Sequence, residues 1–210
     1  MIKEFEKRIL SSLILIPIAI FFIIKGSLYF TVFLIILFLA TSYEWVKMSK
    51  KNNLLKFLGM TFLLFSFYAT FKFRSENNLE DFLLIMTICV LTDIGGYIFG
   101  RLFKGPKLTK ISPKKTYAGV FGGFFLSLIA GIIIYQYKYI SQIPDQLLYF
   151  LILILLISLI SQIGDLTISY FKRKAKIKDT GKILPGHGGL LDRIDGMIFV
   201  FPISYLITII

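Results

Sequence analysis

The sequence predicts an all-α integral membrane protein: a polytopic helical bundle of about seven transmembrane helices with its N-terminus in the cytoplasm. Of its 210 residues, 56% are hydrophobic and only 17% are charged, whereas soluble domains of this size are about half apolar or less. The apolar residues form long stretches, each near the ~20 residues that cross ~30 Å of hydrocarbon. The single cysteine, Cys89, excludes a disulfide framework and a CxxC metal site.

Seven apolar stretches follow one another along the chain. Their approximate cores are 9–24, 28–43, 54–71, 82–100, 117–137, 147–168 and 196–210. Three basic residues precede the first stretch, as in a secretory signal. It ends in Lys25-Gly26 without a small-residue cleavage site, however, so we interpret it as a retained span.

Basic residues lie mainly in alternate segments between these stretches. Of the 24 Lys and Arg, 20 fall in the N-terminal tail and in the segments after the second, fourth and sixth stretches. The positive-inside rule therefore places the N-terminus and the two long basic loops, 101–116 and 172–195, in the cytoplasm. Because most of the basic residues behind the net charge of +12 lie in these segments, anionic headgroups or a phosphorylated substrate fit the charge better than nucleic acid.

Polar residues at membrane depth are functional candidates, because a carboxylate there is costly without a partner or a wet cavity. Asp93 and Asp165 are two such carboxylates. In the sixth stretch Ser161, Asp165, Ser169 and Lys172 are spaced by four, four and three residues, which makes one polar stripe on a helix. A helix–helix contact held by serines is the alternative interpretation.

The stretch KDTGKILPGHGGLLDRIDG, residues 178–196, contains three carboxylates, five glycines and the only histidine. Asp192 and Asp195 are three residues apart, so a helix from Leu190 would project both from one face. Two close carboxylates repel unless a cation separates them, and oxygen ligands suit Mg²⁺. The glycines of 186–189 would let the backbone approach a phosphate, although a mobile turn is the alternative.

The segment before the fifth stretch offers a second anion site. Ser112-Pro113 is typical of a helix start with Ser112 as N-cap, and Lys114 and Lys115 would add charge there. Membrane topology alone would also explain these lysines. Six glycines in the flanking stretches indicate close helix packing; they are Gly95, Gly96, Gly100, Gly119, Gly122 and Gly123.

A longer pattern brings these residues together. The run is Ser169-x-Phe171-Lys172-Arg173-x4-Lys178-Asp179-x-Gly181-x2-Leu184-Pro185-Gly186-His187-Gly188-Gly189-x2-Asp192-Arg193-x-Asp195. It resembles the signature of the phosphatidate cytidylyltransferase (CDP-diacylglycerol synthase) family. Gly164-Asp165-Leu166 and the segment 112–116 are also similar to that family, so the resemblance covers roughly residues 92–200.

The resemblance implies a magnesium-dependent enzyme of phospholipid biosynthesis that converts CTP and phosphatidate into CDP-diacylglycerol and pyrophosphate. It implies a multi-pass protein of the cell inner membrane or plasma membrane, with its active site facing the cytoplasm, contacts with membrane lipids and a homodimeric state. Residues 1–210 would form a single membrane domain, with N-terminal spans in 1–90 and the catalytic region in 91–210.

The family pattern also assigns roles to residues. Asp165, Asp192 and Asp195 are expected to hold one or two Mg²⁺ ions, with Lys172 and Arg193 completing the catalytic set. The substrate-binding set is Ser112, Lys114, Lys115, Thr116, Ser169, Arg173, Lys178, Asp179, Gly186, His187, Gly188 and Gly189. Asp179 is either a further ligand or an ion-pair partner of Lys178, and the role of Asp93 stays open.

Three rival functions remain at this stage. A CTP-dependent polyprenol kinase would use the same nucleotide on another lipid. A cation transporter would place Asp93 and Asp165 along an ion pathway. A structural membrane protein would bind anionic lipid through its basic loops and show no magnesium dependence.

Overall fold

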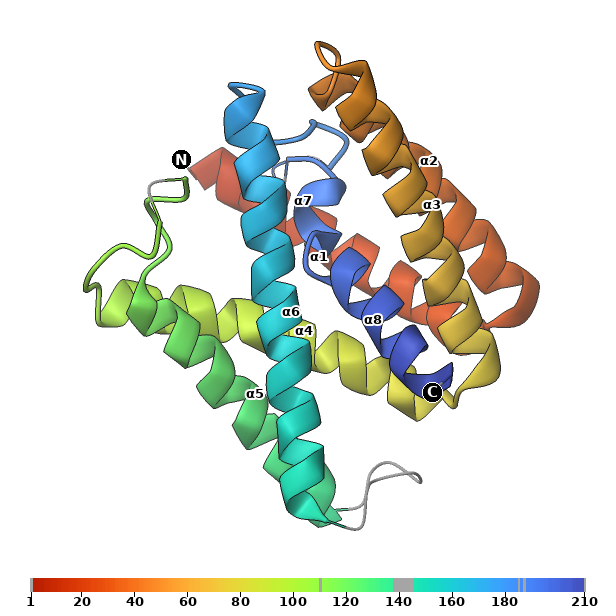
Figure 1. Ribbon diagram of the computed structural model, residues 1–210, viewed down its shortest axis with the longest axis vertical. Helices are drawn as coiled ribbons and strands as arrows, with labels where there is room; N and C mark the ends of the chain where they lie inside the picture. The colour runs from red at the N-terminus through yellow and green to blue at the C-terminus, as the bar shows by residue number, and fades with distance from the viewer. Residues whose placement is uncertain (1, 110, 138–145, 185, 187, 210) are drawn as a thin grey trace.

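The computed structural model describes residues 2–109, 111–137, 146–184, 186 and 188–209. Within these ranges the chain forms eight α-helices and, apart from isolated bridges, no β-strand. Figure 1 shows their arrangement. The helices are α1 (Ile2–Lys25), α2 (Ser27–Met48), α3 (Asn53–Glu76), α4 (Leu79–Leu102), α5 (Tyr117–Tyr137), α6 (Leu147–Lys174), α7 (Leu191–Ile194) and α8 (Met197–Ile209).

The predicted all-α membrane class is confirmed. Five helices, α2 to α6, are long and apolar enough to cross a bilayer, and large apolar side chains such as Leu54, Phe121 and Tyr149 are more than 60% exposed on them. In the searched part of the chain, Leu13–Lys25 and Met197–Ile207 form shorter apolar helices. The count of seven spans and the cytoplasmic N-terminus therefore stay predictions.

Glycines set the closest helix contact, between α4 and α5. A methyl group on Gly95 would collide with the carbonyl oxygen of Gly122, and one on Gly119 would lie 2.8 Å from the carbonyl oxygen of Gly96. Such close backbone approach is typical of small residues in membrane helix pairs. The predicted packing role of these glycines is confirmed.

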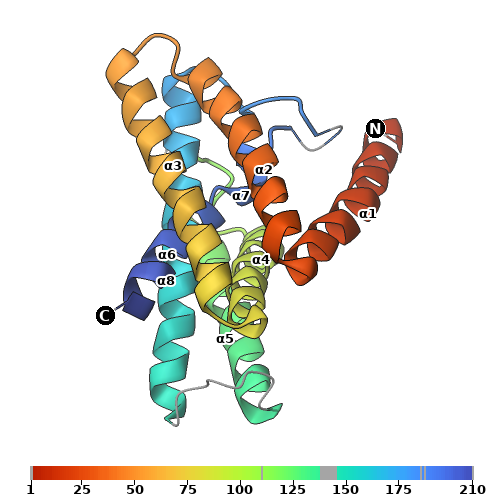
Figure 2. The ribbon, with the colours of Figure 1, turned by 90° about the vertical axis from the view of Figure 1, so that its right-hand side faces the viewer.

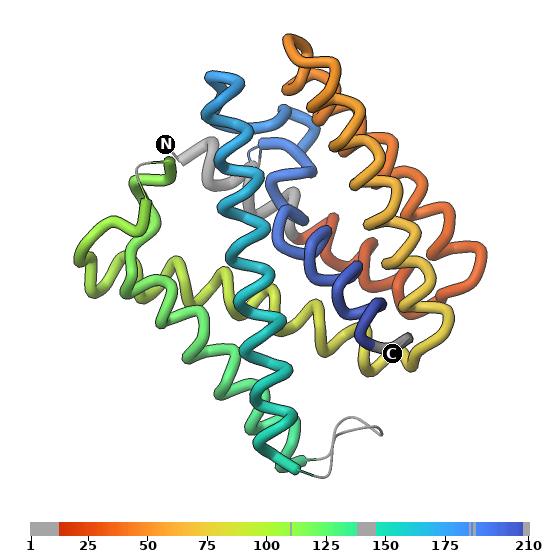
Figure 3. Tube along the Cα trace, in the orientation of Figure 1, coloured from red at the N-terminus to blue at the C-terminus, as the bar shows by residue number. Residues whose placement is uncertain are grey.

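The C-terminal segment lies inside the bundle. α8 packs on α3 and α6, and Figures 1 and 3 show α7 and α8 between α6 and the α2–α3 pair. The α2–α3 connection and the C-terminal end of α6 lie at the same end of the molecule in Figures 1 and 2. Two segments predicted to share the cytoplasmic side therefore lie together.

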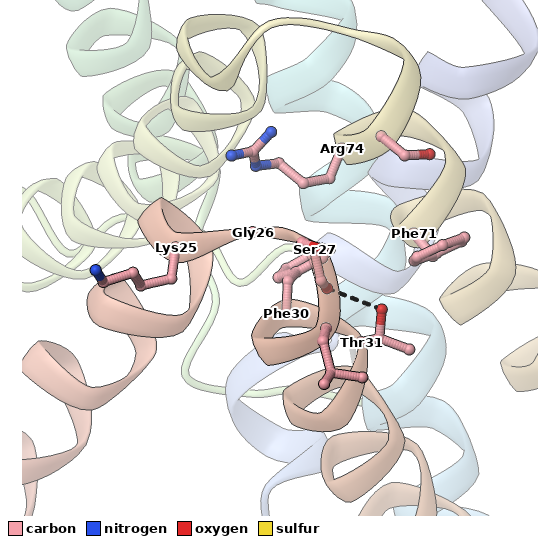
Figure 4. A pocket seen from close by; sticks show the side chains of 9 residues that line it. Lys25, Gly26, Ser27, Phe30, Thr31, Phe71 and Arg74 are labelled. Atoms are coloured by element: carbon pink, nitrogen blue, oxygen red, sulfur yellow. Dashed lines mark hydrogen bonds between the residues drawn. The ribbon is translucent and has the colours of Figure 1, made fainter.

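A separate pocket of about 620 Å³ lies where α1 meets α2, at the other end of α2. Lys25, Gly26 and Arg74 line it (Figure 4). Gly26 turns the chain with φ of 62°, which glycine adopts at little cost. The Arg74 guanidinium donates to the carbonyl oxygen of Ile23 at 3.2 Å. This pocket lies at the junction of α1, α2 and α3, remote from the residues of the family pattern.

Candidate active site

Most of the polar stripe of α6 is buried inside the protein. Ser161, Ser169 and Lys172 are buried. Gly196, at the start of α8, has no room for a methyl group because of the Ser161 side chain, and Gly164 lies against the carbonyl oxygen of Asp195. The stripe therefore packs directly on the segment that carries the predicted carboxylates.

Lys172 and Asp192 form a buried ion pair at the end of this stripe. The Lys172 Nζ lies 2.7 Å from Asp192 Oδ1, and the two side chains are only 10% and 8% exposed. The other oxygen, Oδ2, accepts hydrogen bonds from the backbone N–H groups of Thr180 at 2.8 Å and Gly189 at 3.1 Å. Asp192 thus joins α6, the loop after it and α7.

The glycine-rich loop folds back on itself before α7. The N–H of Leu184 donates to the carbonyl oxygen of Gly188 at 3.1 Å, and Gly186 and Gly188 have φ of 76° and 86°. This left-handed conformation requires glycine at both positions. Gly188 also lies against the side chains of Asp179 and Asp192. The predicted substrate-binding residue His187 lies outside the described residues.

Asp195 has a different environment from Asp192. The predicted helix is a single turn, Leu191–Ile194, and the buried Asp195 follows it. Its Oδ1 accepts the N–H of Gly196 at 3.0 Å. Burial raises the pKa of the Asp195 carboxyl, and the negative charge of Asp165 raises it further. Asp195 and Asp165 are therefore electrostatic neighbours that repel each other.

The predicted helix start at Ser112 is wrong. Helix α5 begins at Tyr117, and Thr116 caps it through its hydroxyl oxygen, which accepts the N–H of Gly119 at 3.1 Å. The carbonyl oxygen of Ser112 instead accepts the N–H of Lys115 at 3.0 Å. This is the closing bond of a β-turn, in which proline at the second position is equally favourable.

This turn places Lys115 against α6. The Lys115 Nζ lies 2.5 Å from Asp165 Oδ2, and the Ser169 hydroxyl donates to Asp165 Oδ1 at 3.3 Å. The side chains of Lys115 and Asp165 are 26% and 30% exposed, so this pair is more accessible than Lys172–Asp192. A predicted substrate-binding residue and a predicted metal ligand thus lie in direct contact.

Several predicted substrate-binding cations lie around these pairs. Arg173 donates from Nε to the carbonyl oxygen of Ile111 at 3.4 Å and so links the end of α6 to the segment 103–116. The exposed predicted residues of the site are Lys114, Arg173, Lys178, Asp179, Gly186 and Arg193. The cations among them give this end of the bundle a positive surface suited to phosphates.

Magnesium binding by Asp165, Asp192 and Asp195 stays a prediction, and the donor chemistry of the site is compatible with it. The Asp165 charge acts on both Asp93 and Asp195. Over the part of the chain that the structure describes, no three His, Cys, Asp or Glu side chains lie close enough together to hold a metal ion. Mg²⁺ is usually bound by one or two carboxylates together with substrate phosphates and water, a requirement that Asp165 and Asp195 meet in donor chemistry.

A large apolar cavity of about 690 Å³ lies among the apolar helices and reaches the segment around α7. Its lining comes mostly from apolar side chains of α1, α2, α3, α4 and α8, and it also includes Leu184, Leu190, Arg193 and Ile194. The cavity therefore extends from these apolar helices to the loop before α7 and to α7 itself, which carries Asp192. An alkyl chain with a negatively charged end matches this combination.

One buried carboxylate at this site escaped the sequence analysis. Glu44, directly after the second predicted stretch, is 1% exposed and accepts hydrogen bonds from the loop before α7. Its sequence signal was a carboxylate beside a span, and its partners are more than 130 residues away.

The site and fold agree with a known class of protein. Residues 53–210 match the model of the Cytidylyltransferase family. The chain belongs to this family and is a nucleotidyltransferase embedded in the membrane by several helices.

Curated relatives confirm the resemblance found in the sequence. The chain is 34% identical over 212 residues to the phosphatidate cytidylyltransferase of Rickettsia bellii (strain RML369-C), an alignment that covers 96% of this chain and 89% of the relative. It is 33% identical to that of Rickettsia felis, with 96% and 91% covered. It is 40% identical over 154 residues to that of Staphylococcus epidermidis, with 73% and 56% covered.

Proposed function

We propose that the protein converts CTP and phosphatidate into CDP-diacylglycerol and pyrophosphate. The observation that carries this proposal is that Arg193 and Ile194, the two residues directly after Asp192 of the Lys172–Asp192 pair, line the apolar cavity. A lipid phosphate needs both environments at once: hydrocarbon for its chains and positive charge for its headgroup. The names of the curated relatives support the same substrates.

The reaction joins two polyanions. An oxygen of the phosphatidate phosphate attacks the α-phosphorus of CTP, a new P–O bond forms, and the bond to the β-phosphate breaks to release pyrophosphate. Such transfers depend mainly on positioning and charge neutralisation. Lys115 and Arg193 would neutralise the approaching phosphates, and Lys172 would act both there and as the partner of Asp192. No covalent enzyme intermediate is required.

Asp165 and Asp195 would hold Mg²⁺, which supplies charge neutralisation and alignment of the phosphates when bound. Asp192 would also become a ligand if its Oδ1 exchanged the Lys172 ammonium for the metal ion. Only Oδ1 is available for this exchange, because Oδ2 already accepts two backbone hydrogen bonds. Lys115 would then be released from Asp165 to the substrate. The two lysines thus balance the carboxylates until the substrates arrive.

The lipid and cellular setting follow from the same arrangement. The acyl chains of phosphatidate would enter the apolar cavity, and Arg193 would meet the lipid phosphate. The basic segments would face the cytoplasm, where CTP is available, in the bacterial inner or plasma membrane. A homodimer is part of this proposal by resemblance.

The direct test is product analysis with the purified protein in detergent. Labelled CTP, phosphatidate and Mg²⁺ should give CDP-lipid and pyrophosphate, and EDTA should stop the reaction. Asp165→Asn should lower turnover strongly, whereas Glu76→Gln, an exposed carboxylate on α3, should not. Formation of CDP with a phosphorylated lipid would indicate a CTP-dependent lipid kinase. Ion flux without CTP consumption would indicate a transporter.

A further inference from the structure

Glu44 is a buried carboxylate that binds the segment before α7, the helix that carries Asp192. Its Oε1 accepts the N–H of Leu190 at 3.0 Å. Its Oε2 accepts the N–H of Leu191 at 2.8 Å and the hydroxyl of Thr180 at 3.0 Å. These three donors therefore compensate its burial.

Glu44 stands on a well-fixed part of α2. The neighbouring Trp45 packs edge-on against Phe171 of α6, with ring centroids 5.3 Å apart, and donates to the carbonyl oxygen of Leu55 at 3.3 Å. Gly59 of α3 makes room for the indole ring. Because α2 is attached here to both α3 and α6, the Glu44 carboxylate has a defined position relative to the stripe of α6.

Glu44 and Asp192 accept hydrogen bonds from the same two segments of the chain. Asp192 accepts the N–H groups of Thr180 and Gly189, while Glu44 accepts the Thr180 hydroxyl and the next two N–H groups, of Leu190 and Leu191. A methyl group on Gly181 would collide with Glu44 Oε1, and one on Gly189 would lie 2.7 Å from Oε2. The glycines are required because the Glu44 carboxylate approaches the backbone closely.

The contact also replaces a helix cap. Leu190 stands at the N-cap position of α7 and makes no side-chain capping bond, since leucine has no side-chain acceptor. The Glu44 carboxylate accepts the hydrogen bonds of the first N–H groups, those of Leu190 and Leu191, instead. The orientation of α7, which carries Asp192 and Arg193 and precedes Asp195, therefore depends on a side chain of the second helix.

We propose that Glu44 is a positioning residue: it fixes the glycine-rich loop and the start of α7 so that Asp192 and Asp195 face α6. It acts through the backbone and does not touch the reacting groups. Its effect on turnover rests on the proposed function, but its effect on the loop does not.

The experiment compares Glu44→Gln and Thr180→Val with Glu76→Gln as the matched control. Glu44→Gln keeps the size of the side chain but has one acceptor oxygen where Leu190, Leu191 and Thr180 need two. Thr180→Val removes only the hydroxyl. Hydrogen exchange of peptides covering 179–196 reports loop order without substrates, and thermal unfolding in detergent reports global stability.

We expect Glu44→Gln to speed exchange at Leu190 and Leu191 about 10- to 100-fold, the effect of losing a hydrogen bond to a charged group. Misplacement of the catalytic carboxylates should lower kcat about 10- to 100-fold, with a smaller change in KM for CTP. Thr180→Val should show the same changes to a lesser degree, and Glu76→Gln should show none.

Unchanged exchange at Leu190 and Leu191 in Glu44→Gln would overturn the proposal, as would wild-type kcat in an active enzyme. If Glu44→Gln does not fold, Thr180→Val decides: wild-type exchange and kcat there would overturn it. Local loss of protection without any CTP-dependent turnover in the wild type would leave the positioning role intact and refute the proposed function instead.

Discussion

Removal of the Lys172 ammonium should destabilise the protein measurably. Lys172→Met keeps the length of the side chain but leaves the Asp192 carboxylate, 8% exposed, without its cation. Breaking a buried ion pair on one side costs about 3–5 kcal/mol. Because the N–H groups of Thr180 and Gly189 still bond to Asp192, we expect the lower end, about 3 kcal/mol. At ~2–4 °C per kcal/mol for a chain of this size, the Tm should fall by about 6–12 °C.

A double-mutant cycle isolates the pair. Thermal unfolding in detergent is measured for Lys172→Met, Asp192→Asn and the double variant. The double variant should be about 2–3 kcal/mol more stable than the sum of the two single losses predicts. The control cycle uses Lys72 and Glu76, whose side chains are 2.8 Å apart but 34% and 45% exposed. That pair should couple by only about 0.3–0.5 kcal/mol. Equal coupling in the two cycles would refute the argument from burial.

Two further predictions concern the repelling carboxylates and the glycine interface. Because the pKa of Asp195 is raised in the folded protein above its ordinary value of 3.8, stability falls as pH rises from that ordinary value toward the raised pKa. With EDTA present, Asp195→Asn should therefore raise the Tm at about pH 8 but not at about pH 3. With magnesium present, the same variant should lose CTP turnover. An equal shift of the Tm at both pH values would contradict the argument from the raised pKa. Gly122→Ala would place a methyl group onto the Phe99 side chain and should cost about 1–3 kcal/mol in thermal unfolding. Gly96→Ala, whose methyl group would be 3.7 Å from its nearest neighbour, should be tolerated; equal losses would argue against close packing as the cause.

The helices and the α6 stripe were predictable because both depend on local order along the chain. Apolar length determines a span, and a spacing of three or four residues determines a helix face. The same local reasoning failed at Ser112-Pro113, since this pair favours a β-turn as well as a helix start. The contact that decides between them, the Thr116 hydroxyl with the N–H of Gly119, is not visible in the motif.

Partners across the chain were not predictable. The sequence pattern assigns Lys115 and Asp165 to different tasks, yet the two side chains are in contact. It does not single out Glu44, which accepts hydrogen bonds from Leu190 and Leu191. A single sequence without an alignment contains no information on which distant side chains meet. Any carboxylate near a span satisfies the same pattern as Glu44.

The sequence by itself determined the membrane class, the positions of the helices and the membership of the carboxylates and lysines in one functional pattern, because composition, length and spacing are properties of neighbouring residues. Only the tertiary structure decided which carboxylate meets which cation, and that α2 supports the catalytic turn through Glu44. Burial and hydrogen-bond distance arise from packing segments that are far apart in the chain, and the energy of each charge depends on that packing.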